Sequence, residues 1–97
     1  TRFDSVVTNR ADSLTVPYIH NPYTEPAGNV RRGTTGNDAK WVQWCLWRFG
    51  LLEENGIDGI IGSKSLSAIK TAQTRLGLAP DGIVGRDTRQ AFINALT

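Results

Sequence analysis

Cys45 and His20 are the side chains best suited to nucleophilic chemistry, and each is the single representative of its type. A thiol nucleophile needs a base within hydrogen-bond reach. His20 lies far away in a Pro-rich stretch, whereas Cys45 falls inside an amphipathic segment. We interpret Cys45 as a small buried apolar residue that, being alone, forms no internal disulfide.

The sequence lacks the residues that a metal site or a phosphate-binding loop needs. One His and one Cys cannot complete a zinc ligand set, and neither an HExxH segment nor a GxxxxGK[ST] loop occurs. We therefore expect no metal, no cofactor and no catalytic residue in this chain.

Two carboxylates stand in matching surroundings. Asp58-Gly59-Ile60-Ile61-Gly62 recurs as Asp81-Gly82-Ile83-Val84-Gly85. A pair of carboxylates can serve as general acid and base. Aspartate also accepts hydrogen bonds from nearby backbone N–H groups, and the glycine after it adopts positive φ without strain. Because each aspartate has a complete local role of this kind, we interpret both as turn-forming.

The rest of each repeat predicts a turn, an apolar plug and a helix. We expect Ile60 and Ile83 to point inward, and Gly62 and Gly85 to let the chain enter the next helix. Buried glutamine must satisfy its amide N–H groups and its carbonyl. If Gln43 and Gln73 are buried, the neighbouring turn backbone can supply these partners, and the alternative for both is a direct ligand contact.

Three amphipathic segments are predicted to be helices that position these turns. They span about 37–49, 63–76 and 86–96, with Asn37 or Asp38 and Ser63 as N-caps and with Gly50 and Gly77 as stops. The residues predicted to face inward are Ala39, Val42, Leu46 and Phe49, then Ser65, Ile69, Ala72 and Leu76, and finally Thr88, Ala91, Phe92 and Ala95. Strand signals are nearly absent, so the fold class is all-α, a small three-helix bundle.

The first 29 residues differ in composition from the rest. Pro17, Pro22 and Pro26 alternate with Tyr18 and Tyr23, which predicts an extended arm over 15–29. The spacing of apolar residues is compatible with a short helix over 3–14. The domain organisation is therefore an N-terminal arm or linker, 1–29, and a helical domain, 30–97. The absence of methionine favours a piece excised from a larger protein.

Three tryptophans lie on the first predicted helix. With Val42 as origin and about 100° per residue, Trp44 falls almost opposite the apolar stripe, and Trp41 and Trp47 flank it. These rings are thus predicted to lie outside the three-helix core. In one interpretation the arm folds back over them with Tyr18, Ile19, Pro22, Tyr23 and Pro26. In the other they are exposed and stack on glycan or on a partner domain.

Basic side chains are scattered rather than clustered. The net charge of +2 suits an anionic surface such as a bacterial wall, and is too small to indicate nucleic acid. The sequence contains no run of about 18 apolar residues, the length that a membrane-spanning helix needs. The cations that could hold a carboxylate are Arg31, Arg32, Lys64, Arg75, Arg86 and Arg89, although a solvated charge is the simpler interpretation for each.

The motifs follow one another in a recognisable order. Residues 30–39 read VRRGTTGNDA, Val42-Gln43 leads to Leu46, Phe49 and Gly50, and the first DGxxG turn precedes Ser65, Ala68, Ile69 and Gln73. Leu76-Gly77-Leu78, the second turn and Thr88 close the series. This series resembles the peptidoglycan-binding domain of bacterial wall amidases, lytic enzymes and spore-cortex hydrolases. It departs at Ala72, where that family usually has Phe, and in its three tryptophans.

The resemblance implies a three-helix carbohydrate-binding accessory domain with two turn-helix repeats, itself non-catalytic. It implies a module that targets a linked hydrolase, such as an amidase or endolysin, to peptidoglycan through the glycan strand, the stem peptide or both. The protein would then be secreted and reside at the bacterial cell wall, with no nucleic-acid or membrane partner. For a wall ligand of glycan and stem peptide, the candidate binding residues are the three tryptophans, which lie outside the family pattern, and five cations: Trp41, Trp44, Trp47, Arg31, Arg32, Lys64, Arg75 and Arg86.

Two other functions are compatible with three short helices. A structural or regulatory module would pack on a partner catalytic domain, as a related helical design does in metalloprotease pro-segments. A helix-turn-helix would bind DNA, although the internal repeat argues against it.

Overall fold

The computed structural model describes residues 21–96 and contains three α-helices and one short 3₁₀ turn. These are α1 (Asn37–Arg48), η2 (Glu54–Gly56), α2 (Ser63–Arg75) and α3 (Arg86–Leu96). The predicted helix over 3–14, the arm residues before Asn21, and His20 lie outside the described residues. Within 21–96 the only ladder pairings are two isolated antiparallel bridges, so the all-α prediction is confirmed.

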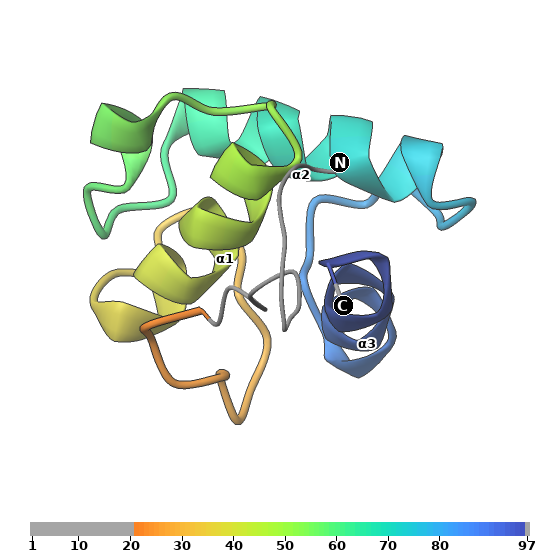
Figure 1. The fold of residues 1–97 in the computed structure, drawn as a ribbon, viewed down its shortest axis with the longest axis horizontal. Coiled ribbons are helices and arrows are strands. Elements are labelled where there is room, and N and C mark those ends of the chain that lie inside the picture. Colours follow the sequence, from red (N-terminus) through yellow and green to blue (C-terminus); the bar gives the residue numbers. More distant parts are fainter. Residues whose placement is uncertain (1–20, 97) are drawn as a thin grey trace, which may run out of the picture.

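The helices pack around α1. Figure 1 shows α2 running along one side of the molecule, with α1 and α3 on the same side of it, and α1 contacts both of the other helices. The fully buried side chains include Val42 and Leu46 of α1, Ile69 of α2 and Phe92 of α3. The apolar stripes that predicted the helices therefore meet in one core. The inward prediction is wrong for Ala95, which is exposed at the end of α3.

The helix starts differ from the prediction. Asn37, Asp38 and Ser63 cap nothing with their side chains, because the N-cap positions of α1 and α2 are Gly36 and Gly62. The first backbone bonds begin at these glycines, with Lys40 N–H donating to Gly36 O at 3.1 Å and Leu66 N–H donating to Gly62 O at 2.9 Å. Glycine is accepted at an N-cap at small cost because it leaves the backbone N–H groups hydrated.

The helix ends follow the prediction. Gly50 and Gly77 adopt φ of 80° and 78° directly after the last turns of α1 and α2. Leu51 N–H then donates to Leu46 O at 2.9 Å, and Leu78 N–H donates to Gln73 O at 2.8 Å. These are the 6→1 bonds of a Schellman motif, which satisfies terminal carbonyls and turns the chain away from the helix axis.

A buried glutamine ties the first turn to α1. Gln43 is fully buried, and its amide N–H groups donate to Asp58 Oδ1 (2.9 Å), Ile60 O (2.9 Å) and Ser65 Oγ (3.0 Å). Gly59 N–H donates back to Gln43 Oε1 at 2.9 Å. One side chain therefore joins α1, the Asp-Gly turn and the start of α2.

The second repeat copies this arrangement. Gln73, also fully buried, donates to Asp81 Oδ1 (3.1 Å), Ile83 O (3.0 Å) and Thr88 Oγ1 (3.3 Å). Gly82 N–H donates to Gln73 Oε1 at 3.0 Å, as Gly59 does in the first copy. We call these two bond sets the glutamine latches. Each glutamine lies on the helix that precedes the turn, and its side chain bonds both to the turn and to a hydroxyl of the helix that follows it.

Each latch requires a glycine directly after the aspartate in the sequence. Gly59 and Gly82 have φ of 83° and 78°, which side-chain-bearing residues rarely adopt. A Cβ at Gly82 would also lie 2.7 Å from Leu66 Cδ1, and one at Gly59 would lie 3.2 Å from Lys40 Cε. The aliphatic parts of the helix side chains therefore cover the turns closely.

The predicted inward direction of Ile60 and Ile83 is wrong. Both are partly exposed, at 56% and 37%, while Ile61 and Val84 are buried. Ile61 N–H donates to Thr34 O, and Val84 pairs with Val30, so these short segments are extended against residues 30–35. Successive side chains of an extended segment point to opposite sides. The second apolar residue of each motif consequently faces the core.

Hydrogen bonds from the glutamine amides and from the turn backbone lower the pKa of both turn aspartates. The Gln43 amide and then Ile60 N–H favour the ionised form of Asp58. For Asp81 the larger cause is Ile83 N–H, followed by the Gln73 amide. Both carboxylates are solvent-exposed, so water screens these effects.

The latches predict a large stability difference between buried and exposed glutamines. Gln43→Ala or Gln73→Ala leaves a buried glycine N–H without its acceptor and opens a cavity, and should lower the free energy of unfolding by about 3 kcal/mol. Gln90→Ala on α3 removes an exposed bond to Asn94 and should change it by no more than about 0.5 kcal/mol. Urea denaturation followed by circular dichroism measures all three. Equal losses in the buried and exposed variants would contradict the role of the latches.

The aspartate pKa values predict loss of stability in acid. Because both lie below the ordinary value of 3.8, the ionised carboxylates stabilise the fold above that pH, and this contribution disappears as pH falls through the folded-state pKa. Denaturation curves from about pH 7 to about pH 2 should show a smaller acid-induced loss for the Asp58→Asn/Asp81→Asn variant than for the native chain. Identical pH profiles would refute this linkage.

Candidate functional site

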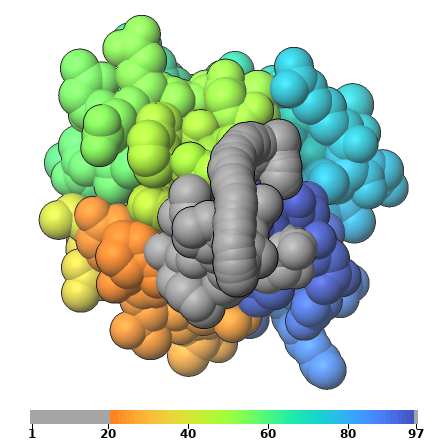
Figure 2. Space-filling view, in the orientation of Figure 1, coloured from red at the N-terminus to blue at the C-terminus, as the bar shows by residue number. Residues whose placement is uncertain are grey.

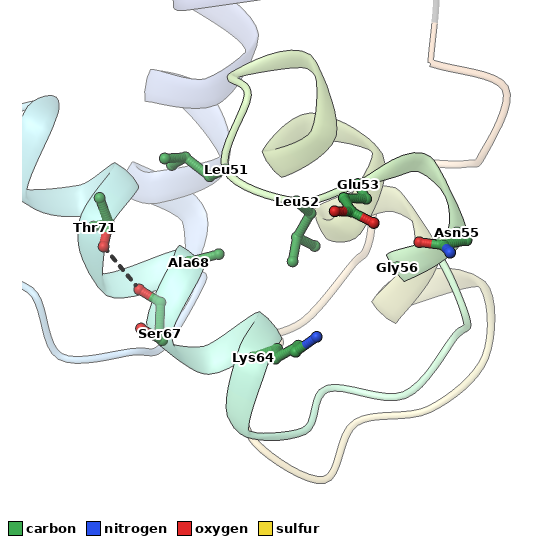
Figure 3. Close-up of a pocket in the computed structure, with 9 residues that line it drawn as sticks. All are labelled: Leu51, Leu52, Glu53, Asn55, Gly56, Lys64, Ser67, Ala68 and Thr71. Carbon is green, nitrogen blue, oxygen red and sulfur yellow. Dashed lines mark hydrogen bonds between the residues drawn. The ribbon is translucent and has the colours of Figure 1, made fainter.

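A groove open to solvent lies between the α1–η2 connection and α2. Its volume is about 390 Å³, within the range of roughly 300–1,000 Å³ found for small-ligand clefts. Figure 3 shows the lining residues on two segments, α2 on one side and residues 51–56 on the other. They are Leu51, Leu52, Glu53, Asn55, Gly56, Lys64, Ser67, Ala68 and Thr71.

One wall is a single face of α2. Lys64, Ser67, Ala68 and Thr71 recur at i, i+3, i+4 and i+7, the spacing that places side chains on one helical stripe. Ala68 is buried at the base of this wall, and the other three residues are exposed. Thr71 Oγ1 donates to Ser67 O at 3.0 Å, so the hydroxyl of Thr71 keeps its lone pairs as acceptors.

The other wall follows from the way α1 ends. The Schellman motif at Gly50 directs the chain into Leu51 and Leu52, both half-buried. The η2 turn then closes through Gly56 N–H donating to Glu53 O at 2.9 Å. Leu52 packs against Gly56, where an added Cβ would lie 3.7 Å from Leu52 Cβ. Glu53 and Asn55 are left exposed along the rim.

The groove carries both signs of charge on opposite walls. Lys64 projects from the first turn of α2 toward the η2 connection, from which Glu53 extends (Figure 3). Their side chains make no ion pair with each other within the described residues. An ammonium offers three donors and a carboxylate offers only acceptors. The arrangement suits a ligand that itself carries an anionic and a cationic group.

The structure corrects the predicted placement of the tryptophans. Trp41 and Trp44 are only 4% and 7% exposed and belong to the main apolar cluster, while Trp47 is half-buried at its edge. Trp44 and Trp47 meet edge to face with centroids 6.2 Å apart, and the Arg48 guanidinium lies 5.4 Å from the Trp47 ring centroid. The faces of Trp41 and Trp44 are thus not open platforms for a sugar ring.

The helical wheel misplaced these rings because it considered the three helices alone. Residues 21–29 also contribute to the packing: Asn21 Nδ2 donates to Trp41 O at 3.1 Å, and Tyr23 is half-buried against the apolar cluster. Pro26 is buried, whereas Pro22 is exposed. These contacts agree with the interpretation in which the arm covers the helix, and Tyr18 and Ile19 lie outside the described residues.

Arg89 has a structural role. It is only 9% exposed, its Nη1 donates to Gly28 O at 2.7 Å, and its Nε lies 3.4 Å from Glu25 Oε2. The guanidinium therefore attaches residues 25–28 to α3 and is not available to hold a ligand carboxylate.

The remaining basic candidates differ in their relation to the groove. Arg31, Arg32, Lys64, Arg75 and Arg86 are all exposed. Of these, only Lys64 lines the groove. Figure 2, coloured by residue number, shows residues 21–30 at the lower left of this face and the C-terminal end of α2 at the upper right. The other cations are consistent with solvated charges.

Cys45 is unsuited to nucleophilic chemistry. It is 2% exposed, and burial raises the pKa of its thiol to about 12. The protonated thiol instead accepts a weak hydrogen bond from Asn21 Nδ2 at 3.7 Å. Within residues 21–96 no three His, Cys, Asp or Glu side chains cluster as a metal site would require. No helix of that part combines the length and apolar character of a membrane span.

Most of the groove was missed in the sequence. Only Lys64 was among the candidate residues, while Glu53, Asn55, Ser67 and Thr71 carried no motif. A signal was nevertheless available, because Lys64, Ser67 and Thr71 form a polar stripe on α2 beside the predicted inward face.

The comparisons with known proteins agree with the fold. Residues 35–92 match the family described as "Putative peptidoglycan binding domain". The N-acetylmuramoyl-L-alanine amidase CwlL of Bacillus licheniformis is 29% identical over 92 residues, which cover 94% of this chain. The chain spans only 26% of that amidase.

Two solved structures share the architecture. The SleB N-terminal domain superimposes with a TM-score of 0.72 and 27% identity, covering 76% of this chain and all of that one. A peptidoglycan-binding protein from Clostridioides difficile, solved with glutamine hydroxamate, gives a TM-score of 0.61 and 33% identity over 66% of this chain and 39% of that one. With the family model spanning both turns and the helices around them, the chain belongs to the peptidoglycan-binding domain family.

Proposed function

We propose that this chain is a non-catalytic module that binds peptidoglycan and keeps a covalently linked hydrolase on the bacterial wall. The observation that carries the proposal is the family match over residues 35–92 together with an open, mixed-charge groove on the same domain. The alignment with the similar amidase covers only 26% of that protein, which leaves room for a catalytic part outside it.

Tethering provides a function without a reactive group. A hydrolase joined to a wall-bound module encounters its polymer at a high effective concentration, so even a weak site raises the rate of productive encounters. The module is proposed to span residues 30–97 and to act at the wall, outside the cell membrane. Its ligand is the glycan strand, the stem peptide or both.

A structural or regulatory role is the second candidate because of the turns. Ile60 and Ile83 are the large apolar side chains of residues 21–96 that stay most exposed. Apolar side chains presented at matching turn positions could pack on a linked catalytic domain. Under this role, Ile60→Ser/Ile83→Ser should lose association with that domain in size-exclusion chromatography, whereas Lys64→Gln in the groove should keep it.

Purified sacculi test the proposal directly. The chain should pellet with sacculi at low salt and be partly released as salt screens its charges. The Gln43→Ala/Gln73→Ala variant, weakened in its fold, should pellet less, and microcrystalline cellulose should retain neither protein. A native chain that stays in the supernatant with sacculi at low salt would refute peptidoglycan binding.

A further inference from the structure

The groove distinguishes between the two ligand types that peptidoglycan offers, and this inference rests on the proposed function. Glycan strands are chains of N-acetylated sugars, whereas stem peptides are short and carry carboxylates and, where they are not cross-linked, a free amine. The two classes demand different surfaces. A sugar ring is held best by a flat aromatic face, and a zwitterionic peptide by separated charges with polar groups between them.

No aromatic ring of the described residues lines the groove. The six aromatic side chains of residues 21–96 are Tyr23, Trp41, Trp44, Trp47, Phe49 and Phe92, and all are buried or half-buried elsewhere. Phe49, the nearest in sequence to the groove, packs edge to face on Phe92 at 5.3 Å between centroids. The surface therefore lacks the platform on which a glycan would stack.

The charges of the groove match a peptide. Lys64 stands on the α2 wall and Glu53 on the opposite wall, with the hydroxyls of Ser67 and Thr71 and the Asn55 amide along the same cleft. A peptide backbone has donors and acceptors that such hydroxyl and amide groups satisfy. Lys64 can bind a carboxylate of the ligand, and Glu53 can bind an ammonium group. Both contacts are charge-assisted hydrogen bonds, which are stronger than hydrogen bonds between neutral groups.

The floor matches small side chains. Leu51, Leu52 and Ala68 supply the apolar surface between the charged walls. Methyl groups, such as those of the alanines in stem peptides, would bury there with a gain of about 25 cal/mol per Å². No feature of the groove calls for a ligand with a long or bulky apolar side chain.

We propose that this groove binds an uncross-linked stem peptide, with Lys64 holding a carboxylate and Glu53 holding the free amine of the diamino acid. Leu51, Leu52 and Ala68 contact the alanine methyl groups. Acylation of the amine, as occurs when a stem is cross-linked, removes the positive charge that Glu53 recognises. The module would thereby favour wall regions rich in free stems.

Soluble probes separate the two ligand types. Isotope-labelled chain is titrated with three probes, and its amide shifts are followed by NMR. The probes are the tetrapeptide Ala-γ-Glu-Lys-Ala with its N-terminus acetylated, so that the lysine Nε is its only amine, the same peptide acetylated on the lysine Nε as well, and an N-acetylglucosamine tetramer. The tetrapeptide should shift residues of the 51–56 connection and of the 64–71 face. Acetylation of the lysine Nε should weaken binding roughly three- to tenfold, the effect of losing one partly exposed charged contact. The sugar tetramer should leave the groove unshifted.

Charge-matched variants locate the site. Lys64→Gln should weaken tetrapeptide binding roughly three- to tenfold, whereas Arg75→Gln, which removes an exposed cation of the same helix outside the groove, should not. Glu53→Gln should weaken binding of the free-amine peptide and leave binding of the acetylated peptide unchanged. Glu54→Gln, also exposed and next along the chain, is its control. Circular dichroism verifies that all four variants keep the native helix content.

The outcomes distinguish this inference from the proposed function. Binding of sacculi without any tetrapeptide shift in the groove would overturn the stem-peptide site and leave wall binding intact. Equal losses for Lys64→Gln and Arg75→Gln would show general charge attraction and overturn it as well. Groove shifts with the sugar tetramer alone would assign the site to glycan instead.

Discussion

The fold depends on two buried glutamine amides that satisfy two aspartate-glycine turns. Gln43 and Gln73 are fully buried, and each amide bonds to the turn and to the hydroxyl at the start of the following helix. A buried amide without partners would cost roughly 1–3 kcal/mol. The turn must therefore take the conformation that offers a carboxylate, a carbonyl and a glycine N–H at once. The positive φ of Gly59 and Gly82 is part of the same condition.

This constraint also positions the groove. The Gln43 latch joins α1 to the first turn of α2, where Ser65 accepts its bond beside Lys64. The Schellman motif at Gly50 directs Leu51 and Leu52 back along the side of α2. The two walls thus have a defined relation because both are attached to α1. A domain of this size has a small apolar core, and hydrogen-bonded turns contribute to its specificity in place of a larger one.

The burial of Trp41 and Trp44 shows that the short segment 21–29, which precedes the helices, affects which side chains are exposed. Two hydrogen bonds attach residues 21–29 to the helices. Asn21 donates to Trp41 O of α1, and Arg89 of α3 donates to Gly28 O. Arg89 looks like a surface cation in the sequence, yet its guanidinium is buried against Gly28 O. In a small domain such a segment decides which side chains remain available to a ligand. Here it leaves the polar face of α2 open while aromatic surface is buried.

The amino-acid pattern alone determined the three helices, their glycine ends and the two repeated turns, because these features follow from local periodicity and backbone preference. The pairing of Gln43 and Gln73 with the turns was also accessible, since a buried amide requires nearby partners. Tertiary structure alone decided that Ile61 and Val84, rather than Ile60 and Ile83, face the core, because the pairing with residues 30–35 sets that register. It also decided that Trp44 is buried and that Glu53 lies across a groove from Lys64. These are distances between segments remote in sequence, which packing fixes and local pattern does not encode.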